Sequence, residues 1–584
     1  MESNVTLKQQ DINNALMNES ERSNTTQSRD IKTSTFDKSF QQATSFNAGL
    51  AVPVLLQEVY PGDTYEIDAN ALIRLSAPSN TPFMSVNYDL SLFFVPFEQI
   101  DKEFHQLMGE NNEYGFSDTN IKFPKLVIND NRFMFTENDL GNYFNIPINT
   151  PMHDIKNNIS EELNLYPFLA YGKIWNEHYR DQNLQGSINI TTWNNVNRRI
   201  YSTDYEPSMS FYESIIFGKG LAPTSKLPSY YTTNLPYQQK GNTINLGSYK
   251  LDELYVTNKN FDFATSFIPS YRYSDGKAIT TSAGSHVVLN KDGVTEVYTG
   301  VAGGDYLGNP NLNLGIKAIG NPSPYNINDL RESIVAQHLL ENFALCGSRY
   351  VEQLKSIWGI EVDPKTIGRT EIIGGYNDTL QYGNIPQTSQ TTKDSPLGAL
   401  SSNLYNSVDL PHFEYSSGQH GYIMGIVTCR TTINNGGQGL PKLFSYDNYL
   451  DLFNPMFNGI GEQPTKNKEL FYSSDLMENE KTFGFNEPFI NTKYNIDNAN
   501  GFMSLKSKTS LFPMFLFGEA YSDASKPKLS DEWIRYNPNI IGNTLFQVND
   551  VNIEFYHQFV SLISYKIIYT TEQPLFNSPR VYGI

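Results

Sequence analysis

The chain has 584 residues and a formal net charge of −19, from 43 Lys and Arg against 62 Asp and Glu. This balance excludes a protein that holds nucleic acid through its overall charge, because phosphate binding depends largely on neutralisation by Lys and Arg. Aromatic residues make up 13% of the chain and charged residues only 18%, a composition that suits extensive protein–protein contact. An AT-rich genome, which favours Asn, Tyr, Phe and Ile codons, explains the same composition equally well.

The two cysteines, Cys346 and Cys429, are too few for a disulfide scaffold or a cysteine metal cluster. They fit folding in a reducing cytoplasm. Residues 1–30 contain no apolar stretch of the kind found in a signal peptide. No run of 18 apolar residues occurs that would predict a membrane span.

The first 34 residues are predicted to form a polar arm. Asn, Ser, Thr and Gln dominate residues 1–34, which contain few apolar anchors. Such a segment does not fold by itself, because it cannot bury enough apolar surface to offset its loss of conformational entropy. It orders against a partner or remains a disordered tail.

Two strands are predicted after this arm. Apolar residues alternate with polar ones over residues 65–75, which is typical of a half-buried strand. The same pattern recurs over residues 86–94, where Phe93 and Val95 also fill the second face. We therefore expect the second strand to be covered on both sides.

Two more strands are predicted near the other end of the chain. Residues 421–433 are strongly apolar, and a long odd-numbered apolar phase follows over residues 551–569. This phase comprises Val551, Ile553, Phe555, Phe559, Ile563, Tyr565, Ile567 and Tyr569. His557 falls within it and is predicted to be a hydrogen-bonded core residue. Strands at both ends of the chain predict a mainly β sandwich in which early and late strands pair.

Few helices are expected, and they fall mostly between these two groups of strands. Apolar stripes predict helices over residues 97–108, 167–181 and 329–343, and a short one over residues 349–358. Asn328 is placed to cap the third helix. The pattern by itself therefore indicates a β-sandwich with long loop and helix insertions.

Residues 241–320 differ from the rest of the chain in their sequence pattern, which combines short β-like runs with a Gly-rich loop. Two β-like runs flank Asn290, Lys291, Asp292 and Gly293, and Asp-Gly between such runs predicts a hairpin. A Gly-rich loop follows over residues 300–308, with Gly303 and Tyr306 within it. A surface insertion is predicted here; a loop without any binding task is the alternative.

No spacing in the chain predicts catalysis or cofactor binding. The eight His are scattered without metal-ligand spacing, and neither a phosphate-binding P-loop nor a Gly-x-Ser-x-Gly nucleophile motif occurs. We expect no catalytic, cofactor-binding or metal site, although loop carboxylates at a subunit contact remain open to calcium. Aromatic and basic residues alternate at Tyr179-Arg180 and at residues 271–273. Such residues can serve ordinary packing or bind single-stranded nucleic acid, and the sequence does not decide between these roles.

Residues 170–185 (AYGKIWNEHYRDQNLQ) form the most distinctive block of the chain. Its distinguishing positions are Trp175, Asn176, Glu177, Arg180, Asp181, Gln182 and Asn183. No catalytic chemistry requires this order. The block resembles a signature of the major capsid proteins of microviruses, the small single-stranded DNA phages, and of their gokushovirus-like branch in particular.

Other blocks resemble the same family in order and spacing. They lie at residues 35–49, 52–64, 92–96, 327–331, 347–352, 371–375, 419–422, 461–463 and 483–485. The chain departs from the family where a basic patch is usual, since residues 226–233 read KLPSYYTT, and it has His178 where an aromatic is usual. These departures indicate a divergent branch.

The resemblance implies a fold and a function. It implies an eight-stranded, Greek-key viral jelly-roll β-sandwich with long loop and helix insertions. The chain then divides into a polar arm (1–34), the first part of the jelly roll with helical insertions (35–240), the surface insertion (241–320) and the remaining jelly roll (321–584). The implied function is a major capsid protein that self-assembles into a T=1 icosahedral shell around circular single-stranded DNA.

The resemblance also implies partners. The expected homo-oligomer is a pentamer that builds the full shell, and the expected partners are a small basic DNA-binding peptide, a minor pilot protein, the packaged single-stranded DNA and a host surface receptor. The basic peptide agrees with the charge of −19. The insertion would face the host at the three-fold axes through Asn290, Lys291, Asp292, Gly293, Gly303 and Tyr306. The protein would reside in the virion, assembled in the bacterial cytoplasm.

Two other classes of protein remain open at this stage. A carbohydrate-binding or carbohydrate-cleaving β-sandwich is compatible with the richness in Tyr and Asn, although no pair of carboxylates is singled out for glycoside cleavage. A phage adhesin or tail component usually shows repeats or coiled-coil stretches, and neither is visible in the sequence.

Overall fold

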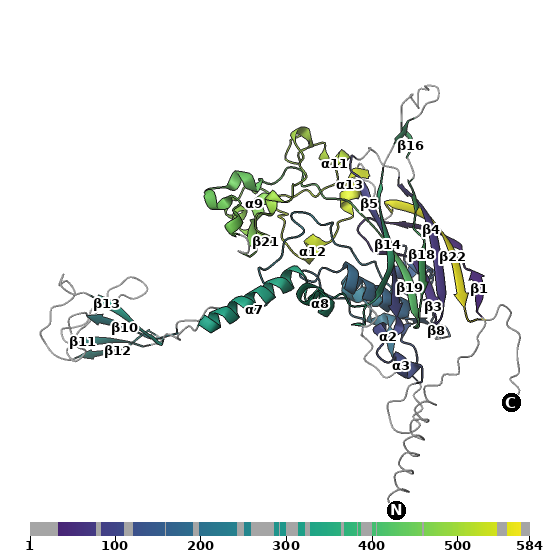
Figure 1. Ribbon diagram of the computed structural model, residues 1–584, viewed down its shortest axis with the longest axis horizontal. Coiled ribbons are helices and arrows are strands. Elements are labelled where there is room, and N and C mark those ends of the chain that lie inside the picture. Colours follow the sequence, from purple (N-terminus) through teal and green to yellow (C-terminus); the bar gives the residue numbers. More distant parts are fainter. Residues whose placement is uncertain are drawn as a thin grey trace, which may run out of the picture. The chain divides into compact units, whose positions relative to one another are not determined.

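The computed structural model describes residues 33–76, 83–109, 121–157, 159–190, 198–241, 250–258, 285–290, 293–299, 314–321, 327–363, 367–381, 384–386, 400–403, 406–457, 461–545 and 557–573 (Figure 1). Contacts divide the chain into two compact units, residues 1–240 with 341–584 and residues 241–340. The first unit contains two main antiparallel β-sheets.

One main sheet joins strands from the two ends of the chain. Its long central pair is β4 (Thr64–Leu75) and β22 (Phe559–Thr571). The strands β1 (Ser34–Asp37) and β2 (Phe40–Phe46) pair with β22 on one side, and β17 (Asn406–Asp409) and β18 (Phe413–Ser416) pair with β4 on the other. Early and late strands therefore pair, as the sequence predicts.

The second main sheet follows the order β14-β5-β19-β3. Its members are β3 (Val52–Val59), β5 (Val86–Pro96), β14 (Glu371–Leu380) and β19 (Gly421–Arg430). All three neighbouring pairs are antiparallel. This sheet, too, combines segments that are more than 300 residues apart in the chain.

The core lies between these sheets and continues beyond the second one. Strand β22 buries its odd-numbered residues from Phe559 to Thr571, which confirms the predicted phase for the part of it that the structure describes. Tyr565 donates a hydrogen bond from its hydroxyl across the sandwich to the carbonyl of Val54 (3.1 Å). In β19 every residue from Gly421 to Cys429 is buried, because α5 (Tyr166–Ile174) lies against it and β5. Strand β5 is thus covered on both faces, as predicted.

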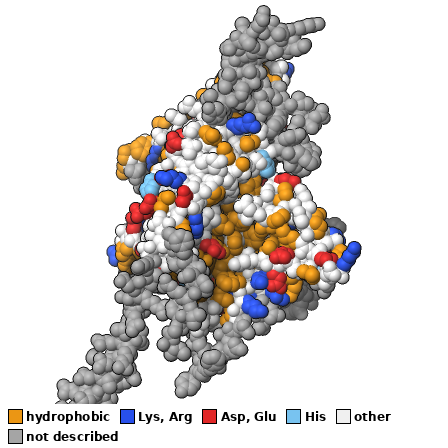
Figure 2. All heavy atoms as spheres, turned by 90° about the vertical axis from the view of Figure 1, so that its right-hand side faces the viewer, with side chains coloured by type: hydrophobic (Ala, Val, Ile, Leu, Met, Phe, Trp, Pro, Cys, Tyr) orange, Lys and Arg blue, Asp and Glu red, His pale blue; other side chains and the backbone are white. Residues whose placement is uncertain are grey.

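The outer face of the first sheet stays partly apolar. Leu72 of β4 and Leu562 of β22 are paired neighbours, and both remain more than a third exposed, as does Val560. The face seen in Figure 2, which is the right-hand side of Figure 1, shows hydrophobic side chains gathered near its middle with charged ones around them. The first sheet therefore presents a mixed surface.

Smaller sheets complete the first unit. The strands β7 (His153–Asp154), β8 (Ile159–Asn164), β6 (Lys125–Ile128) and β9 (Arg199–Tyr201) form a four-stranded sheet in this order, with β6 and β9 parallel. Two hairpin-like pairs join β15 (Asn384–Pro386) to β16 (Leu400–Asn403) and β20 (Gln463–Lys466) to β21 (Thr482–Asn486).

The helices differ from the prediction at their ends. The helix expected over residues 97–108 is wrong as a single element: α2 (Phe97–Ile100) and α3 (Phe104–Leu107) are separated at Asp101, whose buried carboxylate pairs with Arg198. The helix expected over residues 167–181 is formed by α5 and the π-helix η1 (Trp175–Tyr179) that continues it, so it ends at Tyr179.

The third helix, α7 (Ile327–Leu345), begins at Ile327. Asn328 therefore lies within its first turn and not before it, where the prediction placed the cap. The helix α8 (Tyr350–Trp358) forms as predicted. His557 is hydrogen-bonded as predicted, with its ring nitrogens 2.8 Å from Ser45 Oγ and 2.6 Å from Asn138 Oδ1. The prediction that it lies in the core is wrong, because it precedes β22 and is only partly buried.

The remaining described helices are short. The α-helices are α4 (Leu140–Tyr143), α6 (Phe211–Ser214), α9 (Asn467–Leu470), α10 (Leu476–Asn479), α11 (Phe512–Phe515), α12 (Asp531–Ile534) and α13 (Asn539–Leu545). The 3-10 turns are η2 (Ser202–Asp204), η3 (Ile215–Phe217), η5 (Lys442–Ser445), η6 (Tyr449–Asp451), η7 (Pro455–Phe457), η8 (Ile490–Thr492) and η9 (Gly501–Met503).

The second unit contains two antiparallel strand pairs. The strands β10 (Lys250–Asn258) and β13 (Leu314–Asn321) pair along their whole length, and β11 (Ser285–Asn290) pairs with β12 (Gly293–Thr299). Asn290 lies directly opposite Gly293, which confirms the predicted hairpin. Lys291, Asp292, Gly303 and Tyr306 lie outside the described residues.

Candidate functional site

The signature block begins with a buried tryptophan at the end of α5. Trp175 is fully buried, and its indole N–H donates a hydrogen bond to the carbonyl of Pro223 (2.8 Å). Its ring packs edge-on against Phe211 and Tyr212, with centroids 5.3 and 5.9 Å away. Trp175 thereby joins the helix to two later segments, at residues 211–212 and at residue 223.

The polar residues after Trp175 hold backbone groups of distant segments. Asn176 exchanges two hydrogen bonds with the backbone of Ile188, accepting at 2.7 Å and donating at 2.8 Å. The carboxylate of Glu177 accepts from the backbone N–H and the hydroxyl of Thr370 (2.9 and 2.7 Å) and pairs with Lys173 (2.8 Å). Thr370 directly precedes β14, so these contacts tie the block to the second main sheet.

The block leaves the helix through a capped turn. The carboxylate of Asp181 accepts from the backbone N–H groups of Asn183 and Leu184 (2.8 and 3.0 Å). Gln182 donates from Nε2 to the carboxylate of Glu352 in α8 (2.7 Å). Asn183 accepts from the hydroxyl of Tyr237 (2.5 Å). The turn therefore fixes α8 and the segment around residue 237.

An arginine outside the block completes this junction. Arg349 donates to the carbonyls of Asn176 and Glu177 (2.6 and 2.8 Å), which lie in the last turn of η1 and have no partner within the helix. Arg369 donates to the same carbonyl of Glu177 (3.1 Å). Arg349 is 172 residues from Glu177, so no spacing in the sequence connects them.

Glu177 reaches the residue before β14, Gln182 reaches α8, and Asp181 caps its own turn. Six of the seven predicted block residues thus make side-chain contacts that fix this turn and the segments around it. The exception is Arg180, whose Nε is buried with no hydrogen-bond partner in the described part of the chain. The adjacent Tyr179 packs edge-on against Phe93 (6.1 Å), so its ring serves packing. The block is a structural junction.

The unusual His178 belongs to the same junction. The Thr370 hydroxyl donates to Glu177 and therefore accepts from Nε2–H of His178, 2.7 Å away. The ring packs against Phe93 at 4.7 Å. Burial, followed by the nearby charge of Arg369, lowers the pKa of His178 to about 4. The imidazole is therefore neutral at pH 7.

This lowered pKa predicts a loss of stability in acid. The unfolded chain binds a proton at His178 near pH 6.5 and the folded chain only near pH 4, so stability is full above pH 6.5 and falls as the pH is lowered toward 4. The free energy of unfolding is measured in urea at pH 7 and at pH 4.5. Between these two pH values we expect it to fall by about 2 kcal/mol more in the wild type than in His178→Gln. His105→Gln, at a half-exposed ring, is the matched control. Equal losses in wild type and His178→Gln would refute this assignment.

Residues 226–233, where the family usually has a basic patch, are packed into the protein. Lys226 is buried, pairs with Glu519 (2.7 Å) and lies over the ring of Trp533 (4.2 Å). Tyr230 donates from its hydroxyl to the carboxylate of Glu469 (2.9 Å). The segment therefore stabilises a second small core and does not present charge to a ligand.

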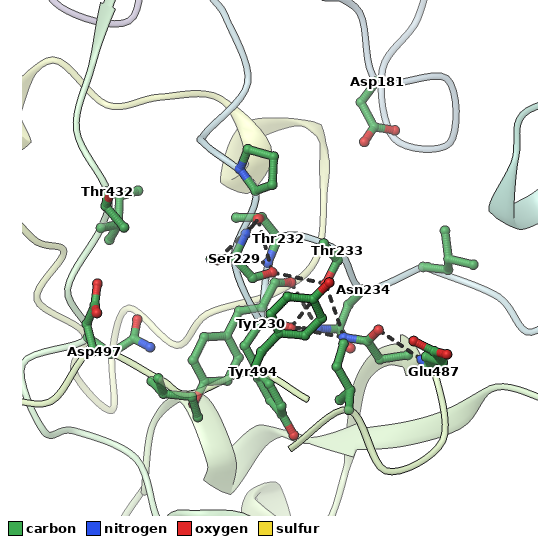
Figure 3. A pocket seen from close by; sticks show the side chains of 18 of the residues that line it. Asp181, Ser229, Tyr230, Thr232, Thr233, Asn234, Thr432, Glu487, Tyr494 and Asp497 are labelled. Atoms are coloured by element: carbon green, nitrogen blue, oxygen red, sulfur yellow. Dashed lines mark hydrogen bonds between the residues drawn. The ribbon is translucent and has the colours of Figure 1, made fainter. Parts of the chain in front are cut away.

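A cavity of about 800 Å³ lies next to the junction (Figure 3). Asp181 from the block lines it, together with Glu487 and Asp497. The buried Asn234 donates to the carbonyls of Tyr230 and Tyr231 (3.0 Å each), while its Oδ1 has no partner among the described residues. Four carboxylates line the cavity (Asp181, Glu462, Glu487 and Asp497) and its described lining residues include no Lys or Arg, so it is not suited to hold the phosphates of DNA.

The described residues contain no group of three or more His, Cys, Asp or Glu that could hold a metal ion. Among the described helices, none combines the length and the apolar character needed to cross a membrane. Residues 271–273 and most of the predicted host-facing loop lie outside the described part of the chain. The contacts of the described block residues are those of packing within the chain.

The described residues form a double-sheet β framework with a hydrogen-bonded junction for its insertions, which is a mainly β, sandwich-like class of protein. The family model described as capsid protein (F protein) matches residues 24–576, and the chain belongs to this family. Its function is that of a microvirus capsid protein, which confirms the resemblance seen in the sequence.

Three relatives agree with this family. The chain is 25% identical to capsid protein VP1 of Chlamydia phage 1, over 87% of this chain and 90% of the relative. It is 26% identical to capsid protein VP1 of Spiroplasma virus 4 (86% and 87% covered) and 28% identical to capsid protein VP1 of Bdellovibrio phage phiMH2K (78% and 79% covered).

Proposed function

We propose that copies of this protein self-assemble through pentamers into a T=1 icosahedral shell that encloses a circular single-stranded DNA genome. The observation that carries the proposal is the family match over residues 24–576. In this role the protein acts through surface contacts repeated by closed symmetry, and not through catalysis. The carbohydrate alternative is not favoured, because the matched relatives are capsid proteins over most of the chain.

We propose further that the wall of this shell is an eight-stranded jelly roll. In chain order the eight strand positions are β1 with β2, β3, β4, β5, β14, β17 with β18, β19 and β22. The first main sheet contains positions one, eight, three and six, and the second contains two, seven, four and five. Strand orders of this kind support two interlocked Greek keys, which is the jelly-roll arrangement.

The net charge supports a basic partner inside the shell. A chain with a charge of −19 repels DNA at long range. A small basic DNA-binding peptide, packaged with the genome, would neutralise phosphates that this chain does not. A minor pilot protein and a host surface receptor complete the proposed partners, with the mature protein in the virion after assembly in the bacterial cytoplasm.

Negative-stain electron microscopy of the purified full chain, with sedimentation of the same sample, tests the proposal. We expect uniform shells or pentamer-sized rings, alone or after addition of the basic peptide. A chain that stays a monomer near 66.2 kDa under both conditions would contradict self-assembly. A monomer that also binds glycans would favour the carbohydrate alternative.

The insertion at residues 241–320 is proposed to face the host at the three-fold axes through Asn290, Lys291, Asp292, Gly293, Gly303 and Tyr306. Deleting residues 259–313 is expected to leave assembly intact and to abolish host attachment. Asn258 and Leu314 are paired neighbours at the end of β10 and β13, so a short Gly linker can close the deletion without disturbing the strands. Electron microscopy measures assembly, and adsorption to host cells measures attachment.

Either of two results would contradict this role. If the shortened chain forms no shells, the insertion is part of the assembly contact. If its shells adsorb to cells as wild-type shells do, the insertion does not bind the host. A control variant, Lys291→Ala with Asp292→Ala, keeps the length of the connection between the paired Asn290 and Gly293 and is expected to leave assembly unchanged.

A further inference from the structure

The segment after β19 exposes an unusual amount of apolar surface. No residue from 440 to 456 is buried. Six large apolar side chains in this apolar loop are each more than half exposed: Leu443, Phe444, Tyr449, Leu452, Phe453 and Met456. Phe444 is 70% exposed and Met456 is 88% exposed. A chain that worked as a monomer would gain nothing from this arrangement.

The apolar loop is nevertheless well ordered by its own polar groups. The carboxylate of Asp451 accepts from the backbone N–H groups of Asp447 and Asn448 (2.8 and 3.0 Å). Asn448 Oδ1 accepts from the N–H of Leu450 (2.8 Å), and Asn454 Oδ1 accepts from the N–H of Met456 (3.0 Å). The backbone is held before any partner arrives, which lowers the entropic cost of binding.

Two contacts anchor the apolar loop to the first unit. The Tyr446 hydroxyl accepts a hydrogen bond from Asn491 (2.6 Å), and the ring of Phe453 packs edge-on against Phe489 (5.5 Å). Both partners lie at η8. The exposed side chains are therefore presented from a fixed base.

The exposed area is of the size that a subunit interface requires. With exposed fractions of 53% to 88%, the six residues together expose roughly 700 to 800 Å². The largest apolar patch on a typical monomer is about 300–600 Å², whereas one side of a standard protein–protein interface covers about 800 Å². The apolar loop therefore matches one half of a stable contact.

The charge of the apolar loop indicates what covers it. Residues 440–456 carry only Lys442, Asp447 and Asp451 as charged groups. DNA or an anionic membrane surface would require several Lys or Arg. Two copies of a chain with a charge of −19 repel each other, so they approach best where charge is scarce and apolar area is large.

We propose that the apolar loop is a subunit–subunit contact that docks on a second copy of this chain. The proposal deepens the proposed self-assembly and rests on it. The exposed aromatic residues and Met456 form the centre of the contact, since aromatics and Met are enriched there and Lys is depleted. Burial of these side chains between copies supplies the attraction that the net charge opposes.

The first test identifies the partner directly. The full chain is made with p-benzoylphenylalanine in place of Phe444, as a mixture of isotopically light and heavy copies, and is irradiated at its highest soluble concentration. We expect crosslinked peptides that join a light copy to a heavy one. Crosslinks only within one copy, including to residues 241–340, or only to DNA or to membrane vesicles, would overturn the proposal, as would the absence of crosslinks.

The second test measures assembly. The double variant Phe444→Glu/Met456→Glu is expected to raise the concentration at which shells or rings form at least ten-fold, with an unchanged melting temperature because both side chains are exposed. Ile155→Glu, at a 64% exposed position outside the apolar loop, is the matched control. Assembly of the double variant at the wild-type concentration would overturn the proposal.

These outcomes separate the two proposals. If the wild type forms shells and the double variant does so equally well, only the assignment of the apolar loop fails. If the wild type forms no shells under any condition, self-assembly fails, and the light–heavy crosslink then decides by itself whether the apolar loop contacts a second copy.

Discussion

Replacing Arg198 with alanine is expected to destabilise the protein by about 3 to 5 kcal/mol, because it leaves the charge of Asp101 buried and unpaired. Arg198 and Asp101 are 3% and 1% exposed, and their side chains form an ion pair. Asp101 also accepts from the Tyr166 hydroxyl (2.6 Å), so the loss spreads to α5. Urea unfolding measures the effect. We expect a lower midpoint, with an unchanged slope of the unfolding free energy against urea concentration.

The matched control replaces both charges. Arg198→Met with Asp101→Leu removes the ion pair without leaving a buried charge, and it is expected to cost much less than Arg198→Ala alone. Arg198 has a left-handed backbone (φ 54°), which both variants retain, so backbone strain does not distinguish them. A loss below about 1 kcal/mol in Arg198→Ala would show that the pair contributes little to stability.

Trp175→Ala is expected to have an effect of similar size at the junction itself. Removal of a fully buried tryptophan costs about 3–5 kcal/mol through lost burial and the cavity that remains, and it leaves the Pro223 carbonyl without its donor. We expect the variant to unfold at lower urea concentration and to yield fewer shells at a given protein concentration.

Trp175→Phe is the control, since it keeps most of the apolar volume and removes the indole N–H. Its expected cost is about 1–2 kcal/mol for the lost hydrogen bond and the smaller ring. If Trp175→Ala unfolds at the wild-type urea concentration, the indole does not hold the insertions together. If it unfolds early but assembles normally, the junction affects stability without affecting assembly.

The repeating patterns of the sequence predicted the β framework well. The odd phase of residues 559–569, the half-buried strand at residues 65–75 and the Asn290–Gly293 hairpin were all readable, because strand alternation and turn chemistry depend on neighbours in the chain. The break in the helix at Asp101 was not readable, because residues 97–108 carry an uninterrupted apolar stripe.

The signature block pointed to the family through the order of its residues, but its physical role depended on partners far away in the chain. Gln182 meets Glu352, and Glu177 meets Thr370, at separations of 170 and 193 residues. No local period encodes such pairs. Residues 347–352 form a family block, but nothing in the sequence links Arg349 to the end of η1.

The sequence by itself therefore determined the class of the fold, which follows from local alternation, and the family, which follows from the order of short blocks. The pairing of early with late strands was indicated by the placement of the predicted strands at both ends of the chain. Only the tertiary structure decided which charges are buried, why His178 stays neutral, and that the apolar loop around Phe444 is left uncovered. Burial and hydrogen bonding depend on segments that meet only in the folded protein. Their contribution to the free energy of folding therefore comes from residues that are far apart in the sequence.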